Sequence, residues 1–343
     1  YAGFGYDPFY FHMFSLLLHI GCVCLVWKLI SSLLRVHGGV SEKQILYVNF
    51  ITTLLFAVHP INVEAVAWIS ALKVLLYAFF YLLGLLCYLR YIRTSKIFYY
   101  VLTIGCFLCS FWGKEQAVTF PLALLIVDWF TNRNMKNLEV WSEKMSFLIM
   151  AFFFGIITVL SQGKGPYEMI FPLYQRLLFG CFALVEYITK SLLPVNLNFF
   201  YPFPIVLGEE PPLHYYLYPV VLLFLMGWII AYRNNRYLVF GVLLFLVNLL
   251  FSIHLFNMSR HAIVADRYMY LSYVGIAFLI ANGIWWLRKR LSYFKAALVF
   301  LFFYCFFLSV YTFHYTKKRE NTTMVKKYTK EVLEKRLNGS NHL

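Results

Sequence analysis

Residues 45–89 read ILYVNFITTLLFAVHPINVEAVAWISALKVLLYAFFYLLGLLCYL. Two apolar runs in this stretch flank a short turn, and the turn holds His59, Asn62 and Glu64. An α-helix of about 20 apolar residues crosses the hydrocarbon core of a bilayer, so runs of this kind are typical of membrane helices. The stretch therefore predicts two apolar helices joined by a turn in which polar side chains are concentrated.

The apolar pattern continues along the chain. Its 343 residues are 62% hydrophobic and only 13% charged, whereas an ordinary soluble domain is about a quarter charged. Apolar helices are expected at 11–34, 45–58, 66–89, 97–112, 116–131, 145–161, 213–232, 237–253, 268–287 and 296–315. The predicted fold class is therefore all-α, a polytopic membrane protein with about ten transmembrane helices.

One further apolar segment, 176–194, has an ambiguous pattern. It carries Arg176, Glu186 and Lys190 and ends at Pro194. Charged side chains are costly within a bilayer. The segment crosses the membrane, re-enters it, or lies in the interface with Glu186 and Lys190 paired at an i, i+4 spacing, and the sequence leaves these alternatives open.

The net charge of +15 arises largely from the connections between the apolar runs. Fourteen of the 30 lysines and arginines lie in five short connections, as the positive-inside rule predicts for a membrane protein. Nucleic acid is therefore not an expected partner. The seven cysteines fall almost entirely within the apolar runs. Cysteine behaves there as a small apolar residue, so neither a disulfide framework nor a zinc site is indicated.

The basic connections also predict the orientation of the first half of the chain. Eight basic residues lie in three connections on one side, whereas the two opposite connections hold only Lys114. The basic side is expected in the cytoplasm, so the turn at His59 faces the periplasm of a bacterium or the lumen of the endoplasmic reticulum. For the second half, charge counting does not decide the orientation. The basic connections are 35–44, 90–96 and 131–144, and the opposite ones are 59–65 and 113–115.

The polar residues expected on this outer side are the candidates for a functional site. A cation beside the first N–H groups of a helix can bind a phosphate, and a carboxylate or a histidine can accept a proton. The predicted catalytic residues are Glu64 and His59, and the predicted lipid-phosphate or donor-binding residues are Lys114, Glu115, Arg260, Asp266, Arg267 and Tyr268.

Structural alternatives exist for the same residues. Glu64 is also placed to interact with the macrodipole of the helix that follows it, and His59 to cap a helix end. Lys114 and Glu115 can satisfy each other within a turn. The aromatic stretch 198–204 reads NFFYPFP and is expected to form an interfacial belt, with a sugar platform as the minor alternative.

Four blocks of the sequence, taken in order, resemble a known family. They are HPINVEAVAWIS at 59–70, GKEQAVTFPLALLIVDW at 113–129, KSLLPVNLNFFYP at 190–202 and ADRYMYL at 265–271. Together they resemble the membrane domain of the tetratricopeptide-containing O-mannosyltransferases that act on cadherins, and that of their bacterial relatives. The resemblance covers about residues 1–316.

The resemblance implies a glycosyltransferase of the C superfamily. Its donor would be a polyprenyl-phosphate-linked sugar in the membrane, its acceptor a protein or glycan hydroxyl, and its active face the outer one. Residues 1–315 would form the transmembrane domain, 176–194 would not cross, and 316–343 would lead into outer-side tetratricopeptide repeats. The dependence on a divalent metal and the oligomeric state are left open.

The sequence departs from that family at two places. Enzymes of the superfamily carry a catalytic acid in the first outer loop, which together with an N-terminal helix would lie before Tyr1. After Ser70 the family continues with a basic residue and an acid, whereas this chain reads ALKV at 71–74. Two hypotheses follow. The chain is an inverting glycosyltransferase in which a carboxylate deprotonates the acceptor hydroxyl, or it is a non-catalytic lipid-carrier-binding or scaffold subunit of a membrane assembly.

Overall fold

The computed structural model of the 343-residue chain describes residues 7–161, 171–198, 200–205, 208–253 and 262–318, together with Lys330. Within these ranges the regular secondary structure is helical, and the extended contacts amount to one isolated antiparallel bridge between Tyr201 and Val264. The predicted all-α fold class is confirmed. Most of the tail 316–343, predicted to lead into tetratricopeptide repeats, lies outside the described residues.

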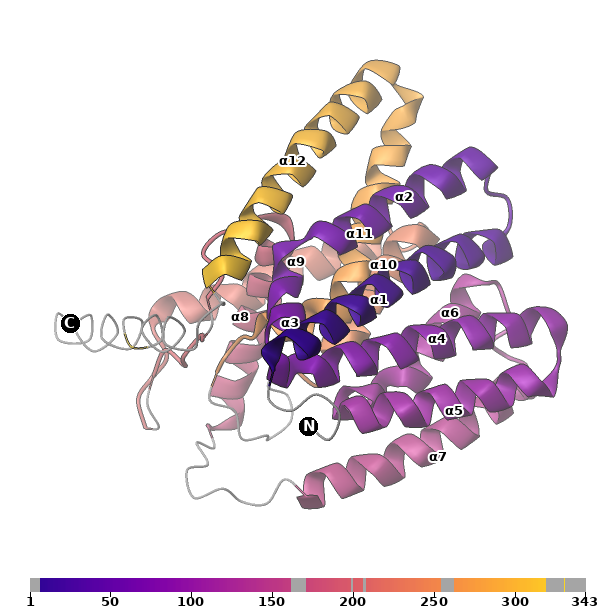
Figure 1. The fold of residues 1–343 in the computed structure, drawn as a ribbon, viewed down its shortest axis with the longest axis horizontal. Helices are drawn as coiled ribbons and strands as arrows, with labels where there is room; N and C mark the ends of the chain where they lie inside the picture. The colour runs from indigo at the N-terminus through magenta and orange to yellow at the C-terminus, as the bar shows by residue number, and fades with distance from the viewer. Residues whose placement is uncertain are drawn as a thin grey trace.

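The helices follow the apolar runs of the sequence (Figure 1). In chain order they are α1 (Pro8–His37), α2 (Glu42–Val58), η1 (Pro60–Asn62), α3 (Val63–Ala67), η2 (Ile69–Ala71), α4 (Leu72–Thr94), α5 (Ile97–Gly113), η3 (Glu115–Thr119), α6 (Phe120–Phe130), α7 (Leu138–Ser161), α8 (Leu173–Leu192), η4 (Leu213–Tyr216), α9 (Leu217–Ala231), α10 (Arg236–Leu249), η5 (Asp266–Tyr268), α11 (Met269–Trp286), η6 (Leu287–Lys289) and α12 (Leu291–Lys318), where η marks a 3-10 helix. Each expected apolar segment overlaps a helix, although 66–89 spans the end of α3, η2 and most of α4, and 237–253 extends beyond the end of α10.

Six helical segments of the described chain have the length and hydropathy of a membrane span. They are Pro8–His37, Ile69–Thr94, Leu138–Thr158, Leu213–Ala231, Asp266–Lys289 and Leu291–Lys318. A seventh span results if α2 and the segment Pro60–Ala67, which meet at a bend of 50°, are counted as one. The remaining expected spans are shorter helices, such as α5 with 17 residues and α10 with 14. The polytopic architecture is confirmed, although fewer helices than expected have full span length.

A polar cap and a proline determine where α2 begins and ends. The hydroxyl of Ser41 accepts a hydrogen bond from the backbone N–H of Gln44 at 3.2 Å. The helix ends at Val58, and the next residue, His59, has an extended backbone with φ −71° and ψ 127°. The cause is Pro60, because proline lacks an N–H and disfavours a helical conformation in the residue before it. The chain therefore turns sharply between α2 and α3.

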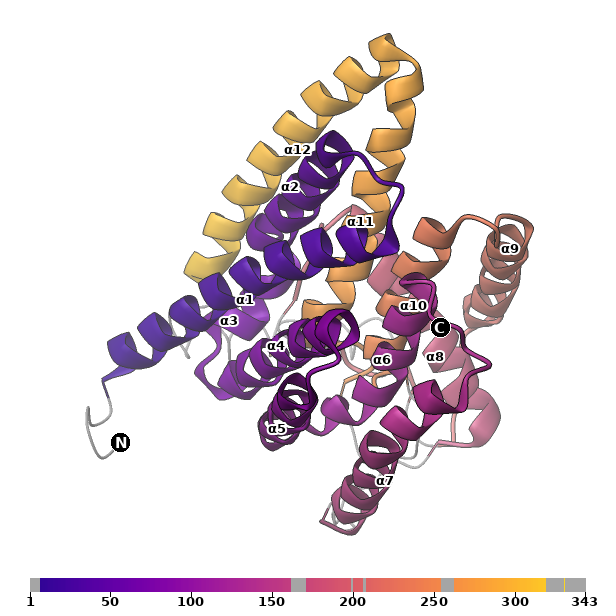
Figure 2. The same cartoon turned by 90° about the vertical axis from the view of Figure 1, so that its right-hand side faces the viewer.

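Glycines allow neighbouring helices to approach closely at two places. A Cβ atom on Gly113 would lie 2.6 Å from the backbone nitrogen of Tyr77, where α5 packs on α4. A Cβ atom on Gly275 would lie 2.5 Å from the carbonyl oxygen of Gly241, where α11 packs on α10. Small residues at such contacts are typical of packing between membrane helices. In Figures 1 and 2, α4 and α5 run side by side, and α12 lies beside α2.

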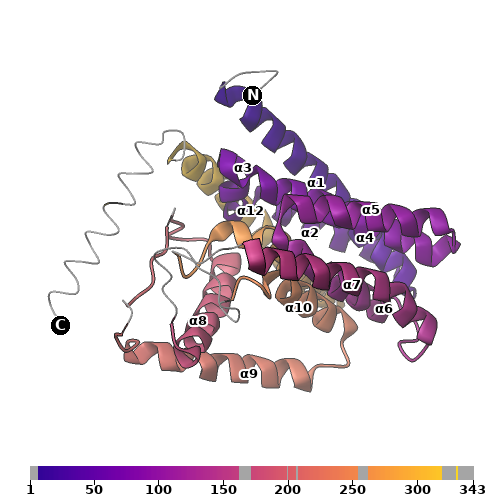
Figure 3. The same ribbon diagram turned by 90° about the horizontal axis from the view of Figure 1, so that it is seen from below.

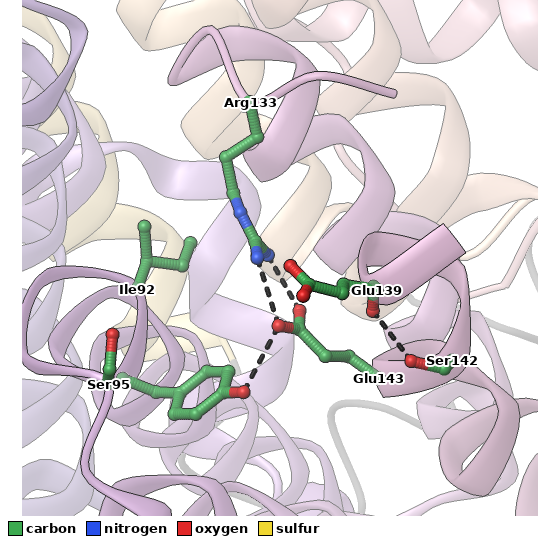
Figure 4. Close-up of a pocket in the computed structure, with 7 residues that line it drawn as sticks. Ile92, Ser95, Arg133, Glu139, Ser142 and Glu143 are labelled. Atoms are coloured by element: carbon green, nitrogen blue, oxygen red, sulfur yellow. Dashed lines mark hydrogen bonds and ion pairs between the residues drawn. The ribbon is translucent and has the colours of Figure 1, made fainter. Parts of the chain in front are cut away.

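A network of charged side chains ties α4, α6 and α7 together at one end of the bundle. Asp128 is fully buried, contacts Lys144, and lies 3.1 Å from the guanidinium of Arg133. The hydroxyl of Tyr88 donates to Asp128 at 2.8 Å, and Arg133 pairs with Glu143 at 2.6 Å. Figure 4 shows Arg133 and Glu143 at the wall of a cavity of about 380 Å³. These contacts give Asp128 a structural role.

The beginning of α10 lies at the same end as this network. Arg236 donates a hydrogen bond to the carbonyl oxygen of Trp129 at 3.1 Å and another to the side chain of Asn132.

Helix α8 is steeply inclined to α9 (Figure 3) and is not among the six segments with the properties of a span. Its Glu186 and Lys190 form the expected i, i+4 ion pair, with 3.4 Å between Oε1 and Nζ.

Candidate functional site

The turn after α2 meets the segment before α11 at the other end of the bundle. Glu64 in α3 is buried, with 3% of its side chain exposed. Its Oε1 lies 2.7 Å from Nη1 of Arg267, and its Oε2 lies 2.7 Å from the backbone nitrogen of the same residue. One carboxylate thus accepts both a main-chain hydrogen bond and a salt bridge from a residue that is distant in the sequence.

Two cations approach the ring of Tyr268. The guanidinium carbon of Arg267 lies 5.0 Å from the ring centroid, and Nζ of Lys114 lies 4.4 Å from it. The same guanidinium is 5.3 Å from the ring of Trp68. A cation over an aromatic face within about 6 Å is attracted by the ring quadrupole. Lys114 is buried, whereas 26% of the Arg267 side chain is exposed, so the cluster joins a buried cation to a partly accessible one.

The neighbouring residue, Asp266, belongs to a second cluster. Its fully buried carboxylate accepts the hydroxyl of Tyr201 at 3.1 and 3.2 Å. Nζ of Lys190 lies 3.8 Å from Oδ1 of Asp266 and 3.4 Å from Oε1 of Glu186. The same ammonium lies 3.3 Å from the centroid of the Tyr201 ring. Two consecutive residues of η5 therefore reach two different ion-paired clusters.

Main-chain contacts hold the segment that leads into η5. The backbone N–H of Ala265 donates to the hydroxyl of Tyr187 at 3.2 Å, and that hydroxyl donates to the carbonyl of Ala265 at 3.4 Å. The N–H of Ile263 donates to the carbonyl of Tyr201 at 2.9 Å. Because Tyr187 lies on α8, this helix positions η5 from one side while Glu64 positions it from the other.

Among the described residues, the charges of the two clusters balance. They comprise three carboxylates, of Glu64, Asp266 and Glu186, and three cations, of Lys114, Lys190 and Arg267. Burial lowers the pKa of Lys190, and the carboxylates of Asp266 and Glu186 oppose this shift. Compensation of this kind is what charged groups in a membrane domain require. A phosphate that reached Arg267 and Lys114 would find two cationic hydrogen-bond donors.

His59 has the contacts of a helix-capping residue. Its Nδ1 accepts a hydrogen bond from the backbone N–H of Ile61 at 3.2 Å, and its ring centroid lies 4.1 Å from that of Tyr273. The side chain is buried. These contacts match the structural alternative for His59, and a catalytic role stays a prediction.

The structure describes seven of the eight predicted site residues. Five of them fall in the two clusters, namely Glu64, Lys114, Asp266, Arg267 and Tyr268. Glu115 is half-buried at the first position of η3. Arg260 lies outside the described residues. Within the described part of the chain, no three His, Cys, Asp or Glu side chains are grouped as a metal site requires.

Sequence reasoning did not connect Lys190 and Tyr201 to Asp266. Both residues lie in segments singled out for other reasons, the helix 176–194 and the aromatic stretch 198–204. The i, i+4 pair of Lys190 with Glu186 was a usable signal, because charges on an apolar helix need polar surroundings. The contact of Lys190 with Asp266 depends on the tertiary fold and leaves no signal in the sequence.

No protein-family model and no solved structure matches the chain. Curated proteins match part of it. Protein O-mannosyl-transferase TMTC2 of Mus musculus is 32% identical over 143 residues, which are 40% of this chain and 16% of that protein. Tmtc3 of Drosophila melanogaster is 28% identical over 153 residues, 39% of this chain and 16% of its own length. TMTC4 of Homo sapiens is 32% identical over 130 residues, 35% of this chain and 18% of its own length.

The chain is similar to the protein O-mannosyl-transferases. This similarity confirms the predicted resemblance to that family over 35–40% of the chain, whereas its predicted extent over residues 1–316 stays a prediction. The matched segments span 16% of each of the first two O-mannosyl-transferases and 18% of the third. The shared part is therefore a small fraction of each relative.

Proposed function

We propose that this membrane domain transfers a mannosyl group from a polyprenyl-phosphate carrier to a hydroxyl of a protein. One observation carries the proposal: Arg267, held by both oxygens of Glu64, approaches the ring of Tyr268 together with Lys114. The relatives are named protein O-mannosyl-transferases. Their name is the reason for proposing mannose as the transferred sugar and a protein as the acceptor.

The two cations suit the leaving group of this reaction. When the bond between the anomeric carbon and the phosphate oxygen breaks, negative charge develops on the carrier phosphate. Charge-assisted hydrogen bonds from a guanidinium and an ammonium stabilise that charge. A guanidinium has five N–H donors, so Arg267 can bind a phosphate while Nη1 remains paired with Glu64.

In this proposal Glu64 positions Arg267. Both of its oxygens face Arg267 at 2.7 Å, and its side chain is 3% exposed. A carboxylate in this orientation is not directed toward an acceptor hydroxyl. The resemblance assigns the general base to the first outer loop of these enzymes, so this role does not fall on Glu64.

The ends at which α7 and α10 begin support an outer location of the two clusters. Helix α7 begins beside the basic connection, and Arg236 at the start of α10 contacts Trp129 and Asn132 near the same connection. The chain thus leaves this end of the bundle in α7 and is back at it where α10 begins. If α7 and α9 each cross the membrane once, α8 lies between them on the opposite side and does not cross. The clusters at the opposite end then lie on the outer, periplasmic or lumenal side.

A non-catalytic subunit that binds the lipid carrier is the second candidate. Each carboxylate of the two clusters lies within 3.8 Å of a cationic side chain. The described clusters therefore hold their carboxylates as ion-pair partners, which favours binding over proton transfer. Such a subunit would recognise the carrier phosphate through Arg267 and Lys114 and would transfer nothing.

The test measures carrier binding and transfer separately. The full-length protein in lipid nanodiscs is given radiolabelled mannosyl polyprenyl phosphate and an acceptor protein. Arg267→Ala and Lys114→Ala are each expected to weaken binding by at least about tenfold, because one charge-assisted hydrogen bond contributes ~1.5–3 kcal/mol. Lys289→Ala is the control, since Lys289 is exposed in η6 at the far end of α11.

Each outcome decides between the candidates. Transfer by the wild type with loss in both variants supports the enzyme. Binding without transfer in the wild type supports the non-catalytic subunit. Undiminished binding in both variants rejects the phosphate site and with it both candidates.

A further inference from the structure

A cavity of about 170 Å³ lies beside the second cluster, between α8 and the segments 198–202 and 263–264. Four aromatic side chains and two polar ones dominate its wall, namely Phe182, Phe200, Tyr201, Tyr215, Glu186 and Asn198. None of the seven predicted site residues that the structure describes lines it. The cavity is therefore a separate feature that adjoins the proposed phosphate site.

The aromatic wall is held in place by packing and by charge. The rings of Phe182 and Tyr215 lie 5.1 Å apart, and Tyr215 lies 5.9 Å from the buried ring of Phe179. Tyr201 is fixed at its hydroxyl by Asp266 and at its ring by Lys190. A rigid set of rings loses little conformational entropy when a ligand binds.

Glu186 is the carboxylate among the described residues of the wall. Its Oε1 lies 3.4 Å from Nζ of Lys190, and 33% of its side chain is exposed. The ion pair orients the carboxylate, and a carboxylate has about four lone-pair positions, so capacity to accept further hydrogen bonds remains. A polar ligand that enters the cavity therefore meets an oriented acceptor.

This combination of groups suits one sugar ring. The C–H groups on a face of a pyranose carry partial positive charge, which the negative face of an aromatic ring attracts. The sugar hydroxyls can donate to Glu186 and to the amide oxygen of Asn198. The volume of about 170 Å³ is below the ~300–1,000 Å³ of sites for drug-sized ligands, so a single ring fits better than an oligosaccharide. An acyl chain would desolvate Glu186 without giving it a hydrogen bond, which is unfavourable.

We propose that this cavity binds the pyranose ring of the transferred sugar and that Glu186 accepts hydrogen bonds from its hydroxyls. The identity of the sugar rests on the proposed function, whereas the binding itself requires no transfer. Lys190 connects the cavity to the phosphate site, because it contacts both Glu186 and Asp266, and Asp266 precedes Arg267 in the chain. Sugar and phosphate would thus be recognised by adjoining clusters.

The test uses saturation-transfer difference NMR with methyl α-D-mannopyranoside and the full chain in detergent micelles. The wild type is expected to bind the glycoside, Glu186→Gln to bind it about tenfold more weakly, and Phe182→Leu several-fold more weakly. Glu210→Gln is the matched control, because Glu210 is an exposed carboxylate that accepts the hydroxyl of Tyr174 at 2.8 Å and does not line the cavity. Melting temperatures show whether each variant is folded.

The probe separates this inference from the proposed function. Methyl mannoside has no phosphate and reports on the cavity, whereas polyprenyl phosphate without a sugar reports on Arg267 and Lys114. Glycoside binding that Glu186→Gln weakens supports the cavity even if carrier binding and transfer fail. Absence of glycoside binding by the wild type, or equal binding by a folded Glu186→Gln variant, overturns the sugar site. Equal weakening by Glu210→Gln also overturns it.

Discussion

Substitution Glu64→Gln tests whether the contact between α3 and η5 stabilises the fold around the site. The carboxylate accepts two hydrogen bonds from Arg267, one from Nη1 and one from the backbone N–H. Glutamine has nearly the same shape, but it carries no charge and presents an NH2 group in place of one oxygen. That NH2 group would face one of the two N–H donors of Arg267, so one hydrogen bond is lost and a charge is left unpaired.

The expected loss follows from the burial of the two partners. A hydrogen bond to a charged group contributes about 1.5–3 kcal/mol, and breaking a fully buried ion pair costs about 3–5 kcal/mol. Arg267 keeps 26% of its side chain exposed, so water solvates part of the guanidinium and the lower range applies. The free energy of unfolding is expected to fall by about 2 kcal/mol.

The assay is unfolding in mixed micelles of increasing dodecyl sulfate content, followed by tryptophan fluorescence. A double-mutant cycle with Arg267→Gln isolates the pair, and the coupling free energy is expected to be about 1–2 kcal/mol. The control is Glu42→Gln, because Glu42 and its partner Arg35 are 77% and 59% exposed and such pairs contribute little. Additive effects at Glu64 and Arg267, with a coupling below about 0.5 kcal/mol, would refute the reasoning.

Two further predictions concern the other end of the bundle and a helix contact. Asp128→Ala removes a fully buried partner of the buried Lys144 and is expected to lower the free energy of unfolding by about 3 kcal/mol; an unchanged dodecyl sulfate midpoint would contradict a structural role. Gly113→Ala places a Cβ atom 2.6 Å from the backbone nitrogen of Tyr77 and is expected to destabilise by about 1–3 kcal/mol. Gly105→Ala on the same helix meets nothing within 4 Å and is expected to be neutral or slightly stabilising, so equal melting temperatures of the two variants would show that α4 and α5 separate at no cost.

The helices could be predicted because apolar runs in a membrane chain have few alternatives to helical structure. Their ends were less predictable. The expected helix 116–131 begins as the 3-10 segment Glu115–Thr119 and becomes α-helical at Phe120, directly before Pro121. The expected helix 66–89 is interrupted after Ala67, and α4 begins at Leu72. Such breaks depend on tertiary contacts, which a hydropathy pattern does not contain.

The grouping of the site was predictable from charge, but its pairing was not. The scarcity of basic residues in 59–65 and 113–115 placed Glu64 and Lys114 on one side of the membrane, and the structure brings both to η5. Asp266 and Arg267 were both predicted to bind the donor, yet they contact different clusters. In a 3-10 helix, with about three residues per turn, consecutive side chains point about 120° apart. Adjacent residues in such a turn therefore contact different parts of the structure.

The pairing of Arg267 with Glu64 also bears on how a phosphate would bind. An arginine on a flexible surface loses side-chain entropy when it binds a ligand, and this costs about 0.5–1.5 kcal/mol for each immobilised side chain. Here the guanidinium is already fixed by one hydrogen bond to Glu64 and by the rings of Trp68 and Tyr268, while the backbone N–H of Arg267 donates to the other oxygen of Glu64. Its remaining donors are therefore oriented before the ligand arrives. Loss of Glu64 would leave the charge of Arg267 in place but release its orientation, so carrier binding should weaken even though the positive potential rises.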